Sequence, residues 1–234
     1  LTSKTRRPLG REGLELSRPV DGLELVENQA VIGLSHVPDQ PGIAAQLFEK
    51  LSEGNINVDL IVQSTHQGNS NDITFTVALN EFEKAKKLCK SIIVDLGGEI
   101  TTQPDMNKLS ISGAGIMGRP GIAATLFENL SRAGINLRVI ATSEVKVSCI
   151  IDAKCGSKAL RVISDAFELN DNQIKINPQM IDHGEPEVRG VAMDPEQAQV
   201  NVREVPDKPG TAAALCSALA EASISIDAIV QSER

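Results

Sequence analysis

The hydrophobic positions of the chain follow one order of elements that occurs three times. Each repeat opens with an alternating or wholly apolar run, which predicts a strand. In the first repeat Ile43, Leu47 and Leu51 then recur at a spacing of four, which gives one apolar stripe and predicts a helix. A second strand is expected after each helix. The opening strands are expected at 30–34, 108–111 and 199–202, and the second strands at 56–62, 135–141 and 224–230.

The repeats also match residue by residue. The segments are PGIAAQLFEKLSEGNINVDLIVQS at 41–64, PGIAATLFENLSRAGINLRVIATS at 120–143 and PGTAAALCSALAEASISIDAIVQS at 209–232. Their first glycines, Gly42, Gly121 and Gly210, are 79 and 89 positions apart. A period of that length indicates a domain rather than a solenoid repeat. In the turn, proline fixes its own φ and glycine tolerates a backbone closed to other residues, and Gly54 and Gly134 lie where a helix would end.

Further elements complete the unit in the first two repeats. Third strands are expected at 73–77 and 145–151, helices at 81–96 and 157–167, and fourth strands at 99–102 and 173–176. The order strand–helix–strand–strand–helix–strand predicts the α+β class: an antiparallel four-stranded sheet with both helices on one face, in a ferredoxin-like arrangement. The third repeat reaches Arg234 directly after its second strand. We therefore expect the chain to be a piece of a longer protein.

Composition narrows the classes of function. The 234 residues carry a formal net charge of −8 and include no Tyr, no Trp and five Phe. This disfavours a nucleic-acid partner, because phosphates are repelled and bases find few aromatic rings to stack on. We interpret the basic run Lys4, Arg6, Arg7 and Arg11 as a solvated end. No run of about 18 apolar residues predicts a membrane span, and the first residues lack a signal-peptide core. The sequence thus predicts a cytoplasmic protein without a membrane partner.

Catalytic and metal-binding motifs are missing from the sequence. There is neither a Walker-type phosphate loop nor a serine nucleophile elbow, and the three histidines are far apart. Gly113, Gly115 and Gly118 superficially resemble a phosphate loop, but their spacing does not fit the dinucleotide fingerprint and the third repeat lacks them. The cysteines have no metal or redox spacing and are expected to be buried thiols in a reducing compartment. They are Cys89, Cys149, Cys155 and Cys216. We expect no catalytic residue, metal or cofactor in this chain.

What does repeat is a turn suited to a small ligand. Backbone N–H groups at the start of a helix attract an anion such as an α-carboxylate. Asp39 is placed to accept from an α-ammonium, and the amides of Gln63 and Asn136 can bond both groups of an amino acid. The alternative is structural: Pro-Gly only makes the strand-to-helix turn and Asp39 caps the helix.

These residues and motifs resemble the ACT domains of aspartate kinase, the family of enzymes that phosphorylate L-aspartate to 4-phospho-L-aspartate with ATP. The markers are VPDQPGIAAQLFEKLSEGNINVDLIVQS, NDITFTVA at 71–78 and KLSISGAGIMGRPGIAATLFENLSRAGINLRVIATSEVKVSCIID, in which ATSEVKVS at 141–148 is the most distinctive. The resemblance runs from Asp21 to Arg234. The third repeat, with VRGVAMDPEQAQVNVREVPDKPG, is similar to the start of a second ACT pair, as in the four-domain enzymes of cyanobacteria and some other bacteria.

The resemblance implies a domain organisation. Residues 1–20 would be a linker from an absent catalytic domain, 21–104 the first ACT domain, 105–178 the second, 179–187 a linker and 188–234 the start of a third. It also implies strand exchange, in which 21–27 complete the second domain's sheet and 189–194 that of the later pair. ATP and Mg would belong to the absent kinase domain, so the chain alone is expected to be inactive.

The resemblance further implies effectors and partners. L-lysine and L-threonine, one or both, would bind for feedback inhibition of the first step of lysine, threonine and methionine biosynthesis. The partners would be the protein's own kinase domain and further copies, in a homo-oligomer through ACT–ACT pairing.

Site residues follow from the same resemblance. A threonine-type pocket would use Asp39, Gly42, Ala44 and Gln63, closed by Asn136 and Leu137 of the second domain. A lysine-type pocket would use Met117, Gly121 and Ile122, with oxygens from Asp59, Ser143 and Glu144. The third domain repeats the first set as Asp207, Gly210, Ala212, Asp227 and Gln231, and its partner domain is expected to be missing. Arg138 stands where the sister copies have Asp59 and Asp227, which argues against equivalent ligand binding in every copy.

Three alternatives stay open. The array could regulate another metabolic enzyme, although ATSEVKVS is not expected there. It could be a free-standing ACT regulatory protein, against which the truncated appearance of both ends argues. A purely structural dimerisation module would show no effect of ligands on its melting temperature.

Overall fold

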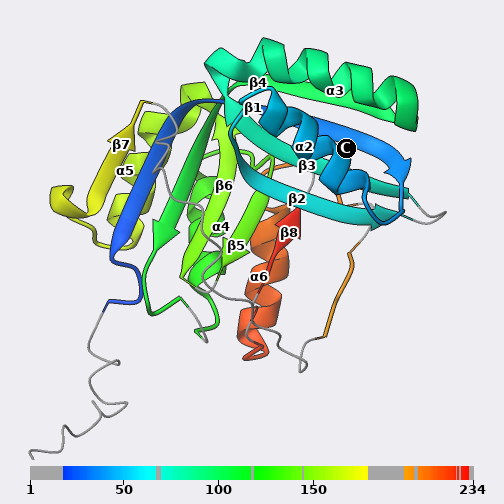
Figure 1. The fold of residues 1–234 in the computed structure, drawn as a ribbon. Coiled ribbons are helices and arrows are strands. Elements are labelled where there is room, and N and C mark those ends of the chain that lie inside the picture. Colours follow the sequence, from blue (N-terminus) through cyan, green and yellow to red (C-terminus); the bar gives the residue numbers. More distant parts are fainter. Residues whose placement is uncertain are drawn as a thin grey trace, which may run out of the picture.

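The structure is a computed structural model that describes residues 18–66, 70–116, 119–143, 145–178, 198–202, 205–224, 226 and 228–231 (Figure 1). It begins with β1 (Gly22–Pro38), α2 (Ile43–Glu53), β2 (Val58–His66), β3 (Ser70–Ala78), α3 (Phe82–Leu96) and β4 (Glu99–Ser112). It continues with α4 (Ile122–Arg132), β5 (Ile140–Ser143), β6 (Lys146–Asp152), α5 (Gly156–Ala166), β7 (Ile174–Asn177), α6 (Thr211–Glu221) and β8 (Val230–Gln231). Short 3-10 turns lie at Leu79–Glu81, Ala153–Cys155 and Asp171–Gln173. We call the described parts of 21–104, 105–178 and 188–234 the first, second and third modules.

The first module has the expected α+β fold. Its strands lie side by side in the order β2-β3-β1-β4, all antiparallel. Alternate residues of β1 and β3, such as Ile32 and Phe75, are fully buried against α2 and α3. The helices contribute Leu47, Leu51 and Cys89 to this core. The alternating apolar residues of the strands and the apolar stripes of the helices therefore pack into one core, as predicted.

The second module repeats this arrangement with one strand added. Residues 22–26, the first part of β1, pair with β4 on one side and with β7 on the other. The pairing with β7 is parallel, from Leu23 opposite Ile174 to Val26 opposite Asn177, whereas an antiparallel sheet was expected. The segment predicted to be exchanged, 21–27, thus lies inside the sheet of the second module. β1 and β4 run through both modules and join them into one sheet.

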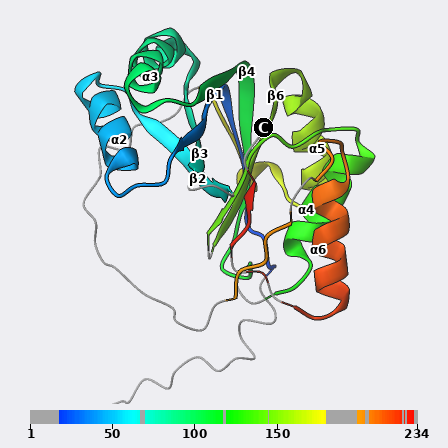
Figure 2. The ribbon, with the colours of Figure 1, turned by 90° about the vertical axis from the view of Figure 1, so that its right-hand side faces the viewer.

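The two modules face each other through the sheet surfaces that carry no helices. Figure 2 shows α2 and α3 on one side of the strands and α4, α5 and α6 on the other. A small apolar cluster lies where the two halves of this sheet meet and consists of Val31, Val62, Met106, Val139 and Ile150. Next to it the Lys108 ammonium, in a nearly buried side chain, forms an ion pair with Asp59 of β2. These contacts fix the two modules relative to each other.

The second strands begin later than predicted, at Val58, Ile140 and Val230 rather than at 56, 135 and 224. The reason is that the preceding residues still close the helices. The amide of Ile56 donates to the Leu51 carbonyl at 2.9 Å, and Ile135 and Ile224 make the same bond to Leu130 and Leu219. This 6→1 bond requires a left-handed residue before it, and that residue is Asn55, Gly134 or Ser223. Gly54, expected to end α2 in the same way as Gly134, has an ordinary negative φ.

The strand expected at 199–202 is not present, because strand hydrogen bonds need a neighbour and no described strand lies beside these residues. Val200 is 79% exposed. The third module is therefore represented by α6 and β8, both of which pack on the second module. None of the described helices is long and apolar enough for a transmembrane span.

Candidate functional site

The second and third modules pair through equivalent elements. α4 lies against α6 (Figure 2), and β5 pairs antiparallel with β8, with Ala141 opposite Val230. These two residues occupy the same place in their repeats, 89 positions apart. A Cβ added at Gly121 would lie 3.9 Å from the Ala220 Cβ, and one at Gly210 would lie 2.8 Å from the Ser131 Oγ. The second contact is the first with the modules exchanged, so the two modules are related by an approximate two-fold axis.

Each helix of the repeated turn starts from a glycine with a left-handed backbone. The φ angles of Gly42, Gly121 and Gly210 are 98°, 99° and 101°, a region in which only glycine is relaxed. No side chain caps any of the three helices, which excludes the alternative that Asp39 is a cap. The first amides of α2 and α6, those of Ile43 and Thr211, make long bonds of 3.3 and 3.4 Å to the turn carbonyls of Gln40 and Lys208. The next N–H groups of the first turn remain available to an anion.

The turn of the third module meets the second module in a polar cluster. The Asn136 Nδ2 donates to the Asp207 Oδ1 at 2.7 Å. The Arg138 guanidinium lies between two carboxylates, 3.4 Å from the Asp207 Oδ2 and 3.6 Å from the Asp152 Oδ1. Gly210 and Ala212 follow on the same turn, and Gln231 pairs with Ile140 in the β8–β5 ladder. We call Asn136, Arg138, Asp152 and Asp207 the 136/207 cluster.

This placement differs from the prediction in two ways. Asn136 and Leu137 were expected to close the set of Asp39, and the third set was expected to lack its partner. Instead, Asn136 faces Asp207, so the second module is the partner of the third. The reason is that the free edge of β5 and the outer side of α4 can each contact only one other module. β8 and α6 of the third module occupy both. Leu137 is buried in the core of the second module.

The first set lies on a separate turn. Asp39 is exposed and accepts from the Asn71 Nδ2 of its own module at 2.7 Å. Gly42 and Gln63 are exposed and Ala44 is half-buried. Among the described residues, no hydrogen bond joins this turn to Asn136. The buried Asn71 Oδ1 also has no hydrogen-bond partner there. The first module therefore presents half of a site.

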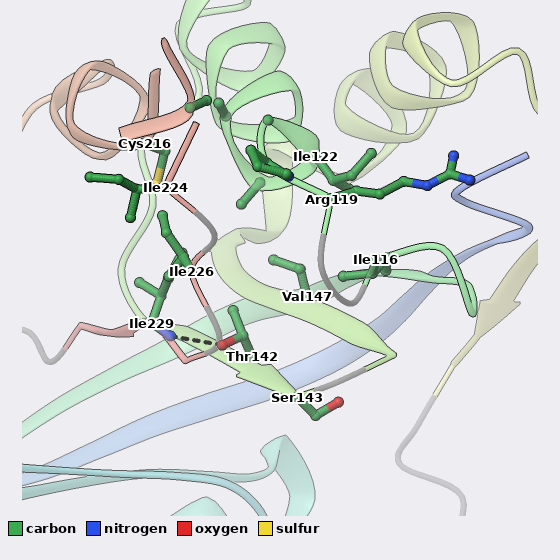
Figure 3. Close-up of a pocket in the computed structure, with 15 residues that line it drawn as sticks. Ile116, Arg119, Ile122, Thr142, Ser143, Val147, Cys216, Ile224, Ile226 and Ile229 are labelled. Carbon is green, nitrogen blue, oxygen red and sulfur yellow. Dashed lines mark hydrogen bonds between the residues drawn. The ribbon is translucent and has the colours of Figure 1, made fainter. Parts of the chain in front are cut away.

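A pocket occupies the other symmetry-related position, where the turn of the second module faces the third (Figure 3). Three residues predicted for a lysine-type site line it: Gly121, Ile122 and Ser143. The third module adds an apolar wall of Cys216, Ile224, Ile226 and Ile229. The wall is anchored by the Ile229 amide, which donates to the Thr142 Oγ1 at 2.7 Å.

Of the remaining lysine-type residues only Asp59 can be placed, and it does not line the pocket. Asp59 is held by Lys108 between the two modules, and Met117 and Glu144, like Asp227, lie outside the described residues. Arg119, Thr142 and the isoleucine wall also line the pocket and were not predicted. The repeat could have identified the wall, since Ile226 is the counterpart of Leu137 and Ile229 that of Ile140. Their role depends on which modules pair.

The cysteine in the pocket wall is not an activated nucleophile. Burial raises the pKa of the Cys216 thiol in the pocket wall to about 11, so the thiol is protonated at neutral pH. Burial likewise raises the pKa of Cys89 and of Cys149 to about 12. No group of His, Cys, Asp and Glu among the described residues could hold a metal ion. The arrangement suits reversible binding of a small polar molecule.

The glycines at 113 and 115, beside the pocket, are explained by close backbone packing. A Cβ at Gly113 would lie 2.4 Å from the Pro19 carbonyl oxygen, and one at Gly115 would lie 2.5 Å from the Pro19 Cα. Glycine is needed because the segment that enters β1 passes directly over this loop. The loop continues to Ile116, which lines the pocket.

Comparisons with known proteins agree with this architecture. Models of the ACT domain match residues 30–91 and 109–167, and again 198–234. The crystal structure of aspartate kinase from Synechocystis is 44% identical, covers 93% of this chain and 37% of that chain, and superposes with a TM-score of 0.85. The regulatory subunit of aspartate kinase from Thermus thermophilus is 38% identical over 64% of this chain and 99% of that chain, with a TM-score of 0.59. An aspartate kinase from Pseudomonas fluorescens is 36% identical over 64% of this chain. The chain spans about 37% of that protein's length.

Proposed function

Because the chain belongs to the ACT-domain family, in the group of aspartate kinase regulatory regions, we propose that it senses amino acids and regulates an aspartate kinase. The observation that carries the proposal is the meeting of Asn136 and Asp207 across the second and third modules. It places an amide and a carboxylate from one module each beside the free start of α6.

The chemistry of the cluster fits a zwitterionic amino acid. Asp207, 57% exposed, can accept from an α-ammonium in addition to Asn136, because a carboxylate has about four lone-pair positions. The N–H groups of the first turn of α6 can receive the α-carboxylate. The pocket at Gly121 and Ile122 is a second place for such a ligand, with an apolar wall in place of the acidic residue.

The whole protein would contain more than this chain. We propose that a kinase domain with ATP and Mg lies elsewhere in the protein and transfers phosphate to L-aspartate, and that lysine and threonine act on it as feedback inhibitors. Such an enzyme would act in the cytoplasm. A homo-oligomer is expected, since the exposed half-site of the first module has room for another module. Typical couplings of about 1–3 kcal/mol between effector and substrate sites suffice for strong feedback.

The test is calorimetric titration of the chain with threonine and with lysine at millimolar concentration. At least one of them is expected to bind, and Asp207→Asn is expected to weaken that binding about tenfold or more, because a charge-assisted bond is lost. Asp39→Asn, the same change in the first module, is the matched control and should leave the affinity almost unchanged. A folded sample that binds neither amino acid would refute the sensing function and favour a structural pairing module.

A further inference from the structure

The inference concerns Arg138, which stands where the other two repeats have an aspartate. Arg138, Asp59 and Asp227 occupy the same position of the three aligned segments. In the first module the aspartate is used between the two modules, in the ion pair with Lys108. In the second module the side chain points instead to the turn of the third module. The charge at this position is therefore reversed at the place where two modules meet.

The Arg138 guanidinium lies close to any ligand that binds Asp207. It lies 3.4 Å from the Asp207 Oδ2, while the Asn136 amide occupies the Oδ1. The Arg138 side chain is only 25% exposed, which limits screening by water. An ammonium group that hydrogen-bonds the same carboxylate must come to within roughly 4–6 Å of the guanidinium, a distance at which like charges repel appreciably.

Among the described residues of the cluster, both carboxylates already face positive groups. Asp152, the other acid, has Arg138 at 3.6 Å and Lys154 at 3.9 Å. The repulsion on the α-ammonium is common to all amino acids and cancels when two of them are compared. An ammonium on the side chain adds a second repulsion that an uncharged side chain does not have.

We propose that Arg138 determines the specificity of the 136/207 cluster, favouring amino acids with uncharged side chains over those with cationic ones. This inference rests on the proposed function, since it presupposes that the cluster binds an amino acid. Arg138 acts through its fixed charge, while Asn136, Asp207 and the start of α6 contribute to binding every ligand alike.

The experiment measures the affinities of threonine and lysine for the chain and for Arg138→Gln, which removes the charge but keeps hydrogen-bond donors. The lysine-to-threonine affinity ratio is expected to rise about tenfold in the variant, and less at high salt, because a nearby charge is screened. Arg138→Lys should restore the parent ratio. Arg132→Gln is the matched control: it removes an exposed arginine of the same module whose partner is Glu128 on the same helix.

A second cycle separates this cluster from the pocket at Gly121. In the Asp207→Asn background both affinities should fall by a similar factor, because Asp207 bonds the α-ammonium that the two ligands share, whereas ligands bound in the pocket at Gly121 would keep their affinities. A ratio that stays constant in Arg138→Gln, with both ligands still binding, overturns the role of Arg138 and leaves the sensing function intact. Failure of both amino acids to bind the parent chain overturns the sensing function itself. Equal changes in Arg138→Gln and Arg132→Gln would show a net-charge effect and also overturn the proposal.

Discussion

The first and third modules carry the same turn, yet within the described part of the chain only the turn of the third module contacts another module. Asp39 and Asp207, like Gly42 and Gly210, correspond one to one, and the two glycines have φ angles of 98° and 101°. Asp39 bonds Asn71 of its own module. Asp207 bonds Asn136 and Arg138 of the neighbouring module. The repeated sequence builds two turns of the same geometry, and in the proposed function the neighbouring module decides whether such a turn becomes part of a binding site.

The largest expected effect comes from separating the third module from the second. Ala213 is 5% exposed and belongs to the core of the second module. Ala213→Asp places a carboxylate in this contact at a cost of several kcal/mol unless α6 moves away. We expect amino-acid binding to fall more than about 100-fold, while the first module keeps its structure. Calorimetry and NMR spectra of the first module provide the measurement.

The adjacent alanine is the control for this change. Ala214 lies on the exposed side of the same helix, so Ala214→Asp should leave binding nearly unchanged. If Ala213→Asp bound amino acids as tightly as the parent chain, the binding site would not require the third module. The contact of the Asp207 turn with the second module would then be irrelevant to binding.

A second expected effect concerns stability and the segment that the second module borrows. The first module supplies its own four strands, whereas the second contains residues 22–26 between β4 and β7. Gly113→Ala puts a methyl group 2.4 Å from the Pro19 carbonyl oxygen, so the entering segment must shift. We expect a loss of about 1–3 kcal/mol in the free energy of unfolding, measured by urea denaturation. The neighbouring change Ala114→Ser, at an exposed residue, should cost less than about 0.5 kcal/mol.

Much of the fold could be predicted from the sequence because it is encoded locally. The helices at 81–96 and 157–167 were predicted almost to the residue, since their apolar stripes face a single sheet. The strand at 199–202 was predicted wrongly because alternation describes a strand that has neighbours. The late start of β2 depends on the bond from Ile56 to Leu51, which hydrophobic patterns do not show.

The contacts between the modules were not predicted. Asn136 was named from the repeated turn, and Asp207, Gly121 and Ile122 from the resemblance to aspartate kinase; their role as site residues stays a prediction. Asn136 was assigned to Asp39 because the first and second modules follow each other in the chain. In the structure the second module pairs instead with the third, through β5 with β8 and α4 with α6. Arg138 was noted as a departure from the repeat, but its contact with Asp207, 69 positions away in another module, could not be predicted from the sequence.

A smaller effect is expected from Asn136, whose amide contacts Asp207. Asn136→Ala removes the hydrogen bond to Asp207, and we expect amino-acid affinity to fall about fivefold, the equivalent of one neutral-to-charged bond of about 1 kcal/mol. Asn57 is the counterpart of Asn136 in the first module and is exposed. Asn57→Ala should leave calorimetric affinity within experimental error. Equal losses in the two variants would mean that the first module also contains an occupied site.

The smallest expected effect depends on pH and concerns the borrowed strand. Burial acts to raise the pKa of Glu24, but the hydrogen bond and charge of Lys146, with Lys108 and Lys175, outweigh it and lower that pKa below its ordinary value of 4.5. A carboxyl group whose pKa is lower in the folded protein stabilises the fold above pH 4.5, and this stabilisation is lost as the pH falls through the folded value. Glu24→Gln should therefore lower the free energy of unfolding by about 0.5–1 kcal/mol at pH 7, typical of a partly exposed pair. The difference from the parent should shrink below pH 4.5 in urea denaturation. If the difference in the free energy of unfolding stayed constant down to pH 3, Glu24 would contribute through packing and not through its charge. Residues 22–26 would then be stabilised in the second module by apolar contacts, as the strands of the first module are.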